Sequence, residues 1–406
     1  MRILIYSINY YPELTGIGKY NAEMAEWFVE QGHEVIVVTA PPYYPWWRVR
    51  PPYRAWLYCT EKLKGVKVHR CPLWVPRHPS GIKRLVHLFS FALTSVPLLF
   101  LQFFKRPEVF IVLEPTLFCA PFALGVARLS GARTWLHVQD FEVDAAMGLG
   151  MVSAKGFGQT AEMIERWIMA RFDRISTISE KMVERLVDKG VSRDKCVLLP
   201  NWVDSTAIFP TDTSSSYRGR LNIKDDMCVA LYSGNMGEKQ GLEIIIEAAR
   251  TLVNEPSLVF VLCGEGGARE RLIKRGEGLQ NIHWLPLQPV DKLNELLNLA
   301  DVHLLPQRAD VADMVMPSKL LGMLASGKPV LVTAHPETQL AKVVSSCGKV
   351  VEPANAQDVA EGLRELLHAP QKRKQLGEIA RKMASAWDKT NILSEFETQL
   401  QAICKS

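Results

Sequence analysis

Residues 304–334 contain the residue types best suited to binding an anion. The letters LLPQRADVADMVMPSKLLGMLASGKPVLVTA indicate a strand ending at Pro306, a polar loop, a helix begun by Pro317-Ser318-Lys319 and a second strand from Pro329. Ser318 suits a helix N-cap, and Lys319 places a positive charge in the first turn. In open parallel sheets such a loop lies where ligands bind. We therefore expect an anion site here, the alternative being a solvated lysine on an ordinary crossover.

The first strand-to-helix loop carries two glycines, Gly16 and Gly18. Glycines at a helix start let backbone N–H groups approach a phosphate closely, so we expect both to contact one. The pattern departs from the dinucleotide-binding fingerprint, because Asn21 stands at the position of the third glycine and no acidic residue ends the second strand. The mismatch argues against a nicotinamide cofactor.

His137 and Asp140 come at the end of a predicted strand, in the letters HVQD. His137 is either a neutral structural histidine or a residue that hydrogen-bonds a substrate hydroxyl. We take it as a catalytic candidate. Asp140, together with Tyr11 and Glu13 of the first loop, is a further candidate for binding a substrate.

Residues 41–58, PPYYPWWRVRPPYRAWLY, form a stiff loop that combines prolines, aromatic residues and arginines. Aromatic and arginine side chains suit sugar faces and the headgroup region of a membrane. The loop therefore indicates acceptor binding or membrane contact, with Trp46 as the candidate residue. The alternative is a surface loop packed on its own aromatic side chains.

Residues 82–104 are mostly apolar, and their apolar part lies between Lys83-Arg84 and Lys105-Arg106. Their length allows a membrane span, a segment lying in a bilayer interface, or a buried helix pair. Polar residues interrupt the segment and basic residues flank both ends, which argues against a span. We expect a membrane-associating segment on the cytoplasmic face of the inner membrane.

Composition excludes several other classes of function. The chain of 406 residues has a net charge of +5, with 48% hydrophobic and 22% charged residues, and lacks long basic runs, so nucleic acid is not an expected partner. The eight cysteines show no CxxC or Cys/His ligand spacing, which predicts no metal site. The opening MRILIYSINYYP indicates a strand rather than a signal peptide, so we expect a cytoplasmic protein.

Strands and helices alternate along most of the chain, which predicts doubly wound parallel sheets. A polar, turn-rich stretch at 204–226 interrupts this alternation. We therefore expect domains at 1–203 and 204–385, and a helix within 386–406 that returns to the first domain.

Taken in order, the motifs resemble those of the retaining glycosyltransferases of family 4. The resemblance covers nearly the whole chain and is carried by TGIGKY, HVQD, STIS, LPNWVD, SGNMGEKQGLE, CGEGG, LPLQP, DVHLLPQ and MPSKLLGMLASGKPV. It implies an α/β fold of the GT-B architecture, in which two Rossmann-like doubly wound domains face a central cleft. The first domain would bind the acceptor, with Tyr11, Glu13, Asp140 and Trp46 as candidates, and the second would bind the nucleotide-sugar donor.

The resemblance also implies roles for individual residues. Lys239 and Lys319 would neutralise the donor diphosphate. The donor-binding candidates are Gly16, Gly18, Asn235, Gln240, Gly264, Glu265, Leu287, Asp310, Asp313 and Ser318. The sequence departs from the family pattern at two places, which alters the expected contacts with the donor. Met314 and Gly322 stand where the family has two glutamates, and Asn235 with Lys239 or Gln240 stands where it has an arginine and a lysine.

A narrower resemblance, through NYYPELTGIGKY, TAPPYYP and PTLFC, is to members that build exopolysaccharide of the colanic acid type. It implies transfer of L-fucose from GDP-fucose to a lipid-linked oligosaccharide, with retention of configuration and without metal or cofactor. The alternatives are a catalytically silent sugar-nucleotide-binding subunit and a non-hydrolysing sugar-nucleotide epimerase.

Overall fold

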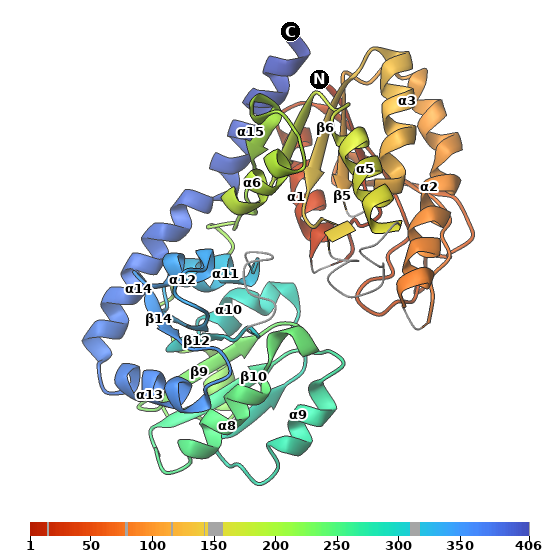
Figure 1. Ribbon diagram of the computed structural model, residues 1–406. Helices are drawn as coiled ribbons and strands as arrows, with labels where there is room; N and C mark the ends of the chain where they lie inside the picture. Colours follow the sequence, from red (N-terminus) through yellow and green to blue (C-terminus); the bar gives the residue numbers. More distant parts are fainter. Residues whose placement is uncertain are drawn as a thin grey trace. The chain divides into compact units, whose positions relative to one another are not determined.

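The computed structural model describes residues 1–13, 16–77, 80–114, 117–141, 143–144, 157–308 and 317–405. The chain forms two compact units, Met1–Asn201 with Ile392–Ser406, and Trp202–Asn391. Each unit has its own sheet with helices packed against it (Figure 1). The expected α/β class, with two doubly wound parallel sheets, is confirmed. The first stretch of the first unit ends at Asn201. The predicted domain bounds of 1–203, 204–385 and 386–406 stay predictions.

The first unit is built on an eight-stranded sheet in the order β3-β4-β2-β1-β5-β6-β7-β8. All neighbouring strands are parallel except β3 and β4. Central strands such as VFIVLE are buried along their whole length, as expected of a sheet covered on both faces. The strands are β1 (Arg2–Tyr6), β2 (Glu34–Thr39), β3 (Cys59–Leu63), β4 (Val66–Arg70), β5 (Val109–Glu114), β6 (Arg133–Val138), β7 (Arg174–Thr177) and β8 (Cys196–Leu198).

Helices cover both faces of this sheet. Its helices are α1 (Ile17–Glu30), α2 (Gly81–Phe103), α3 (Ala120–Ser130), α5 (Phe157–Met169), α6 (Glu180–Asp188) and α15 (Lys389–Lys405). One core cluster joins α2, α3, α5 and α6 to alternate residues of the strands. On the other face, the Phe396 ring of α15 lies 5.8 Å from that of Phe28 in α1 and 5.0 Å from that of Trp135 in β6.

The second unit has a six-stranded parallel sheet in the order β11-β10-β9-β12-β13-β14. Its strands are β9 (Cys228–Ser233), β10 (Leu258–Cys263), β11 (Ile282–Leu285), β12 (Val302–Leu305), β13 (Val330–Thr333) and β14 (Gly348–Val351). Its helices are α7 (Ser216–Arg220), α8 (Glu243–Thr251), α9 (Arg269–Arg275), α10 (Leu293–Leu297), α11 (Lys319–Ala325), α12 (Gln339–Val344), α13 (Ala356–Leu367) and α14 (Pro370–Ala384).

Helix α2 accounts for the long apolar segment as one continuous helix, so the interpretation as a buried helix pair is wrong. By length and composition, it is a helix that could cross a membrane. Lys83 and Arg84 at its start are exposed, but further polar residues are buried: His87 is 1% exposed and Ser95 is fully buried. The exposed residues after Arg84 are apolar, with Phe89 47% and Leu101 55% exposed. This distribution is the reverse of that expected for a helix facing water.

Candidate functional site in the second unit

The sheet of the second unit has a topological switch point between β9 and β12. The chain passes from β9 to its neighbour β10 on one side, and β12 pairs with β9 on the other. Loops that follow β9 and β12 therefore leave in opposite directions, and ligands of open α/β sheets bind beside the carboxyl ends of such strands. Residues 234–241 and 306–308 occupy this position.

Lys319 reaches this edge from the start of α11. Its Nζ donates a hydrogen bond to the hydroxyl of Tyr232, 3.2 Å away, and lies 4.2 Å from the centroid of the Tyr232 ring. A Cβ at Gly234 would lie 3.5 Å from the Cδ of Lys319, so the lysine stem packs against the backbone that leaves β9. The fold thus places the ammonium of Lys319 at the switch point.

The surroundings of Lys319 favour an anionic ligand. Burial lowers the pKa of Lys319 to about 7, because its charged form loses solvation that a neutral hydroxyl partner does not replace. A bound diphosphate would favour the ammonium form and raise this pKa. Tyr232 donates its own proton to the carbonyl oxygen of Asn235, 2.5 Å away, and burial raises the pKa of its hydroxyl, which keeps it neutral.

Two glycines, Gly264 and Gly266, allow the loops after β9 and β10 to touch. Gly264 has a φ of +153°, and a Cβ there would lie 1.8 Å from the carbonyl oxygen of Gly234; a Cβ at Gly266 would lie 2.4 Å from the carbonyl oxygen of Met236. The amide of Met236 donates to the carbonyl of Glu265 over 2.8 Å, and the amide of Ala268 donates to the carbonyl of Met236 over 2.9 Å. The predicted residues Asn235, Gly264 and Glu265 are therefore brought together beside Lys319.

Other predicted donor contacts are placed differently. The side-chain oxygen of Gln240 accepts a hydrogen bond from the amide of Gly237, 3.1 Å away, so it stabilises its own loop. The Glu265 carboxylate is more than half exposed, and Leu287 is exposed two residues beyond β11. The side chain of Lys239, as well as Asp310, Asp313 and Met314, lies outside the described residues.

The expected side-chain cap of Ser318 is wrong. Ser318 occupies the N-cap position of α11 but has helical backbone angles, and its side chain makes no capping hydrogen bond. An N-cap side chain reaches the helix amides from an extended backbone conformation, which Ser318 does not adopt. Because α11 has only seven residues, we assign the positive potential at this edge to the Lys319 charge rather than to the helix dipole.

Three residues at this edge were missed from the sequence. Tyr232 positions Lys319, Arg269 donates from Nε to the carbonyl of Gly264 over 3.1 Å, and the side chain of Arg308 packs against Gly241. Arg308 could have been predicted from the sequence, because it follows a buried strand by only three residues. Tyr232 could not, since an aromatic residue within an apolar strand is expected to belong to the hydrophobic core.

In the first unit, Glu13 joins the first loop to the aromatic loop. Its carboxylate accepts hydrogen bonds from the amides of Tyr43 and Tyr44, each at 2.9 Å, and from the side chain of Asn9 at 2.8 Å. Burial raises the pKa of Glu13. Glu13 therefore positions the loop that carries Trp46. Acceptor contact by Glu13 itself stays a prediction.

Gly16 and Gly18 lie at the start of α1. Gly16 is its N-cap, with a φ of +66°. A Cβ at Gly18 would lie 3.0 Å from the Cβ of Glu13, so Gly18 makes room for that buried side chain. This packing accounts for the glycine at position 18 without any phosphate contact. The predicted contact of Gly16 and Gly18 with a phosphate stays a prediction.

The remaining acceptor candidates present accessible side chains. Tyr11 and Trp46 are exposed, and the guanidinium of Arg50 lies 4.2 Å from the Trp46 ring centroid. Asp140 is exposed, and its charge contributes to the raised pKa of Tyr44, after burial and the charge of Glu13. The structure thus associates Asp140, Tyr44 and Glu13 at the carboxyl edge of the first sheet.

His137 is buried in β6 with protein partners at both ring nitrogens. Nδ1 lies 2.9 Å from the Ser176 hydroxyl, and Nε2 lies 2.9 Å from the side-chain nitrogen of Gln139. Since that amide nitrogen donates, Nε2 accepts and Nδ1 carries the proton. Burial lowers the pKa of His137 to about 4. This is the arrangement of a neutral structural histidine, and the catalytic role stays a prediction.

Within the described ranges, His, Cys, Asp and Glu side chains form no group of three or more that could hold a metal ion.

The fold agrees with the sequence comparisons. Residues 15–202 match the family described as "Glycosyl transferase 4-like domain", and residues 214–383 match "Glycosyl transferases group 1". The chain belongs to the glycosyltransferases that combine these two domains, and the expected enzyme class is confirmed. It is 44% identical over 408 residues to the protein of Escherichia coli (strain K12) named "Putative colanic acid biosynthesis glycosyl transferase WcaI", with 98% of each chain covered.

Solved structures support the same fold. Sucrose-phosphate synthase from Thermosynechococcus elongatus matches with a TM-score of 0.77 at 16% identity, covering 99% of this chain and 98% of that chain. Anabaena HepE, solved in complex with UDP and glucose, matches with a TM-score of 0.70 at 14% identity, covering 99% and 100%. These matches define the GT-B architecture of the chain.

Proposed function

We propose that this glycosyltransferase moves L-fucose from GDP-fucose to a lipid-linked saccharide during synthesis of a colanic acid-type exopolysaccharide. The observation that supports binding of a nucleotide-sugar donor is the partly buried ammonium of Lys319 at the switch point of the second sheet. The choice of pathway is supported by the 44% identity to WcaI, whose name states colanic acid biosynthesis. The choice of fucose comes from the motif resemblance in the first loops.

The proposed chemistry needs positive potential where the leaving group develops charge. Transfer breaks the bond between the sugar carbon and the diphosphate oxygen, leaving GDP with an additional negative charge. Lys319, in its protonated form, neutralises this charge, and Lys239 is a second candidate. A donor aimed at developing charge contributes about 3 kcal/mol to transition-state stabilisation.

We further propose transfer with retention and without a metal ion. The departing phosphate itself takes the proton of the acceptor hydroxyl, so no protein nucleophile is assigned. The acceptor binds the first unit through the aromatic loop fixed by Glu13, with Trp46 and Tyr11 as sugar-stacking surfaces.

Helix α2 supports a location on the membrane surface. Its outward apolar side continues into exposed aromatic residues, because the Tyr58 hydroxyl donates to the carbonyl of Thr94 and the Trp74 amide donates to Ser90. Lys83, Arg84, Lys105 and Arg106 flank the helix with positive charge, which suits an anionic bilayer.

The buried side of α2 favours a position in the membrane interface over a span across the bilayer. Phe91 and Leu99 belong to the core of the first unit, so the helix cannot be surrounded by lipid without dismantling that core. Burying only its outward side in the interface requires no such change. The polar residues that argued against lipid contact in the sequence all belong to sides that face or flank the protein.

Product analysis tests the proposed function. The enzyme is incubated with labelled GDP-fucose and a membrane lipid extract, and label is followed into lipid, free sugar and nucleotide sugar. We expect label in the lipid fraction, with unchanged yield in EDTA. Label converted to another nucleotide sugar indicates an epimerase, and binding without turnover indicates a silent subunit. A thermal-shift screen of other nucleotide sugars identifies the donor if GDP-fucose fails, since ligand at 100 times its Kd adds about 2.7 kcal/mol.

A further inference from the structure

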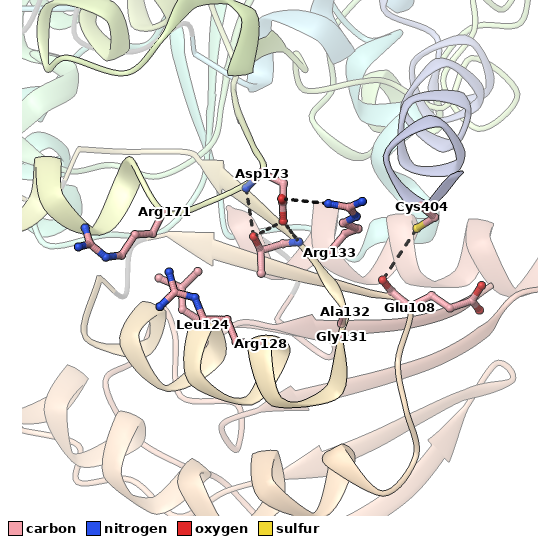
Figure 2. Close-up of a pocket in the computed structure, with 10 residues that line it drawn as sticks. Glu108, Leu124, Arg128, Gly131, Ala132, Arg133, Arg171, Asp173 and Cys404 are labelled. Carbon is pink, nitrogen blue, oxygen red and sulfur yellow. Dashed lines mark hydrogen bonds and ion pairs between the residues drawn. The ribbon is translucent and has the colours of Figure 1, made fainter. Parts of the chain in front are cut away.

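A second concave site lies at the opposite edge of the first sheet from His137. Figure 2 shows this pocket, which has a volume of about 560 Å³ and is lined by the amino-terminal ends of β5, β6 and β7 together with α3 and α15. Glu108, Arg133 and Asp173 mark the strand ends, and Cys404 comes from α15. None of the residues assigned above to donor or acceptor lines it.

Three arginines surround this pocket: Arg128 from α3, Arg133 from β6 and Arg171 from the loop after α5 (Figure 2). The two carboxylates of the lining already have partners. Asp173 accepts from the amide of Thr134 at 2.8 Å and from its hydroxyl at 2.7 Å, and it pairs with Arg133 at 3.7 Å.

The other carboxylate, Glu108, accepts the backbone amide of Arg2 at 2.7 Å. Among the described residues, no carboxylate lies within ion-pair distance of Arg128 or of Arg171. Arg171 stacks its guanidinium 3.4 Å from the Trp167 ring centroid and donates one hydrogen bond to the carbonyl of Trp167. Most of the N–H donors of these two guanidinium groups are therefore available to a ligand.

The rim of the pocket is apolar and basic. Leu129 follows Arg128 and is exposed, as is the Trp167 ring beneath Arg171. The end of α2 lies close by, because the Arg2 side chain donates to the carbonyl of Lys105 over 2.9 Å while its amide binds Glu108. Exposed Phe104 and the basic pair Lys105-Arg106 thus lie beside the same edge.

We propose that this pocket binds a phosphate group, held by Arg128 and Arg171. Guanidinium pairs bind phosphate oxygens with charge-assisted hydrogen bonds, and the pocket is large enough for a phosphate with a substituent. The phosphate belongs either to a soluble phosphate ester or to a phospholipid headgroup, and the apolar rim makes the second source accessible from a bilayer. The inference is independent of the proposed transfer reaction.

Alkylation of Cys404 provides a local test that does not depend on turnover. N-ethylmaleimide labelling of Cys404 is quantified by mass spectrometry, with the exposed Cys59 as the internal control. The probes are inorganic phosphate, pyrophosphate, and vesicles of phosphatidylglycerol or phosphatidylcholine. We expect a phosphate probe or phosphatidylglycerol vesicles to protect Cys404 while labelling of Cys59 stays unchanged in the soluble-phosphate arms.

Two variants make the test specific. In Arg128→Gln/Arg171→Gln the probe concentration for half-protection should rise about tenfold or more, because charge-assisted bonds are removed. Lys372→Gln/Lys374→Gln, an equal change of charge on two exposed residues of the second unit, should behave as wild type. Arg128→Gln alone, on the exposed side of α3, serves if the double variant does not fold.

The outcomes separate the two sources. Protection by soluble phosphate identifies a phosphate-ester site, and protection by phosphatidylglycerol vesicles alone identifies a headgroup site. Absence of protection by every probe, or equal protection in the arginine variants, would overturn the proposal.

Discussion

At the scale of single residues, the proposed donor site depends on a lysine whose protonation state can change near neutral pH. Among the described residues, the hydrogen-bond partner of the Lys319 ammonium is a neutral hydroxyl and not a carboxylate, so no ion pair there neutralises its charge. A permanent ion pair between Lys319 and a carboxylate would cancel the positive potential that stabilises a bound diphosphate. The same environment lowers its pKa to about 7, which makes donor binding and proton binding interdependent.

We predict that GDP binding takes up a proton above pH 7. Free Lys319, with a pKa of about 7, is largely neutral there, and the diphosphate raises this pKa by favouring the ammonium. GDP affinity should therefore fall as pH rises from 7 to the pKa of the bound state, by up to about tenfold per unit. Phosphate ionisation near pH 6 is complete in this range.

Calorimetry in buffers of different ionisation enthalpy measures this uptake. Lys319→Arg is the control, because arginine stays protonated and should bind GDP with little dependence on pH. Constant wild-type affinity between pH 7 and 9 would contradict the adjustable charge.

At the scale of elements, the site depends on two loops whose backbones touch. We predict that Gly264→Ala destabilises the second unit by at least about 2 kcal/mol and weakens GDP binding, because its Cβ would meet the carbonyl of Gly234. Gly267→Ala is the matched control, since a Cβ there meets nothing within 4 Å. Thermal unfolding and GDP titration of both variants test this prediction. Equal stability and equal GDP affinity of the two variants would show that the loop contact is not required.

Helix α2 yields the second prediction at this scale. Phe89→Ser, Leu93→Ser and Phe100→Ser together should lower partitioning onto anionic vesicles about hundredfold, because three half-buried apolar side chains lose about 3 kcal/mol of transfer free energy. Stability in solution should change little, since these side chains point outward. Val253→Ser/Ile379→Ser, at exposed apolar positions of the second unit, is the control for vesicle co-sedimentation.

Charge reversal separates attachment from spanning. In the variant with Lys83, Arg84, Lys105 and Arg106 changed to glutamate, release from membranes supports peripheral attachment. Undiminished recovery after carbonate washing would instead indicate a span.

The elements also show which features the sequence pattern could predict. Apolar runs such as VFIVLE and LVFVLC located buried strands, and their alternation with helices predicted both sheets. The sides of α2 were not predictable, because hydropathy counts His87 and Gln102 against lipid contact without knowing that both face the core. Lys319 was found from its motif, whereas Tyr232 was missed because its role arises from a contact between residues 87 positions apart.

At the scale of the whole molecule, the last helix belongs to the first unit although the chain reaches it from the second. Residues Ile392–Ser406 complete the first unit, and Phe396 is buried against Phe28 and Trp135. We predict that Phe396→Ala costs about 3–5 kcal/mol and lowers only the unfolding transition of the first unit.

Differential scanning calorimetry measures the unfolding transitions, with Phe260→Ala as the matching variant in the second unit. Phe260 is buried in the second unit, so its replacement should lower the other transition. If both variants shift one common transition equally, the two units do not unfold independently.

The measurement that tests the central claim most directly compares Lys319→Ala with Lys239→Ala in turnover and GDP affinity. If Lys319 neutralises the donor diphosphate, its replacement should leave folding intact, reduce turnover by about two to three decades and weaken GDP binding. Arginine at this position should rescue only partly, because its planar group differs from a point charge on a flexible stem. A Lys319→Ala enzyme with near-native turnover and GDP affinity would contradict the account.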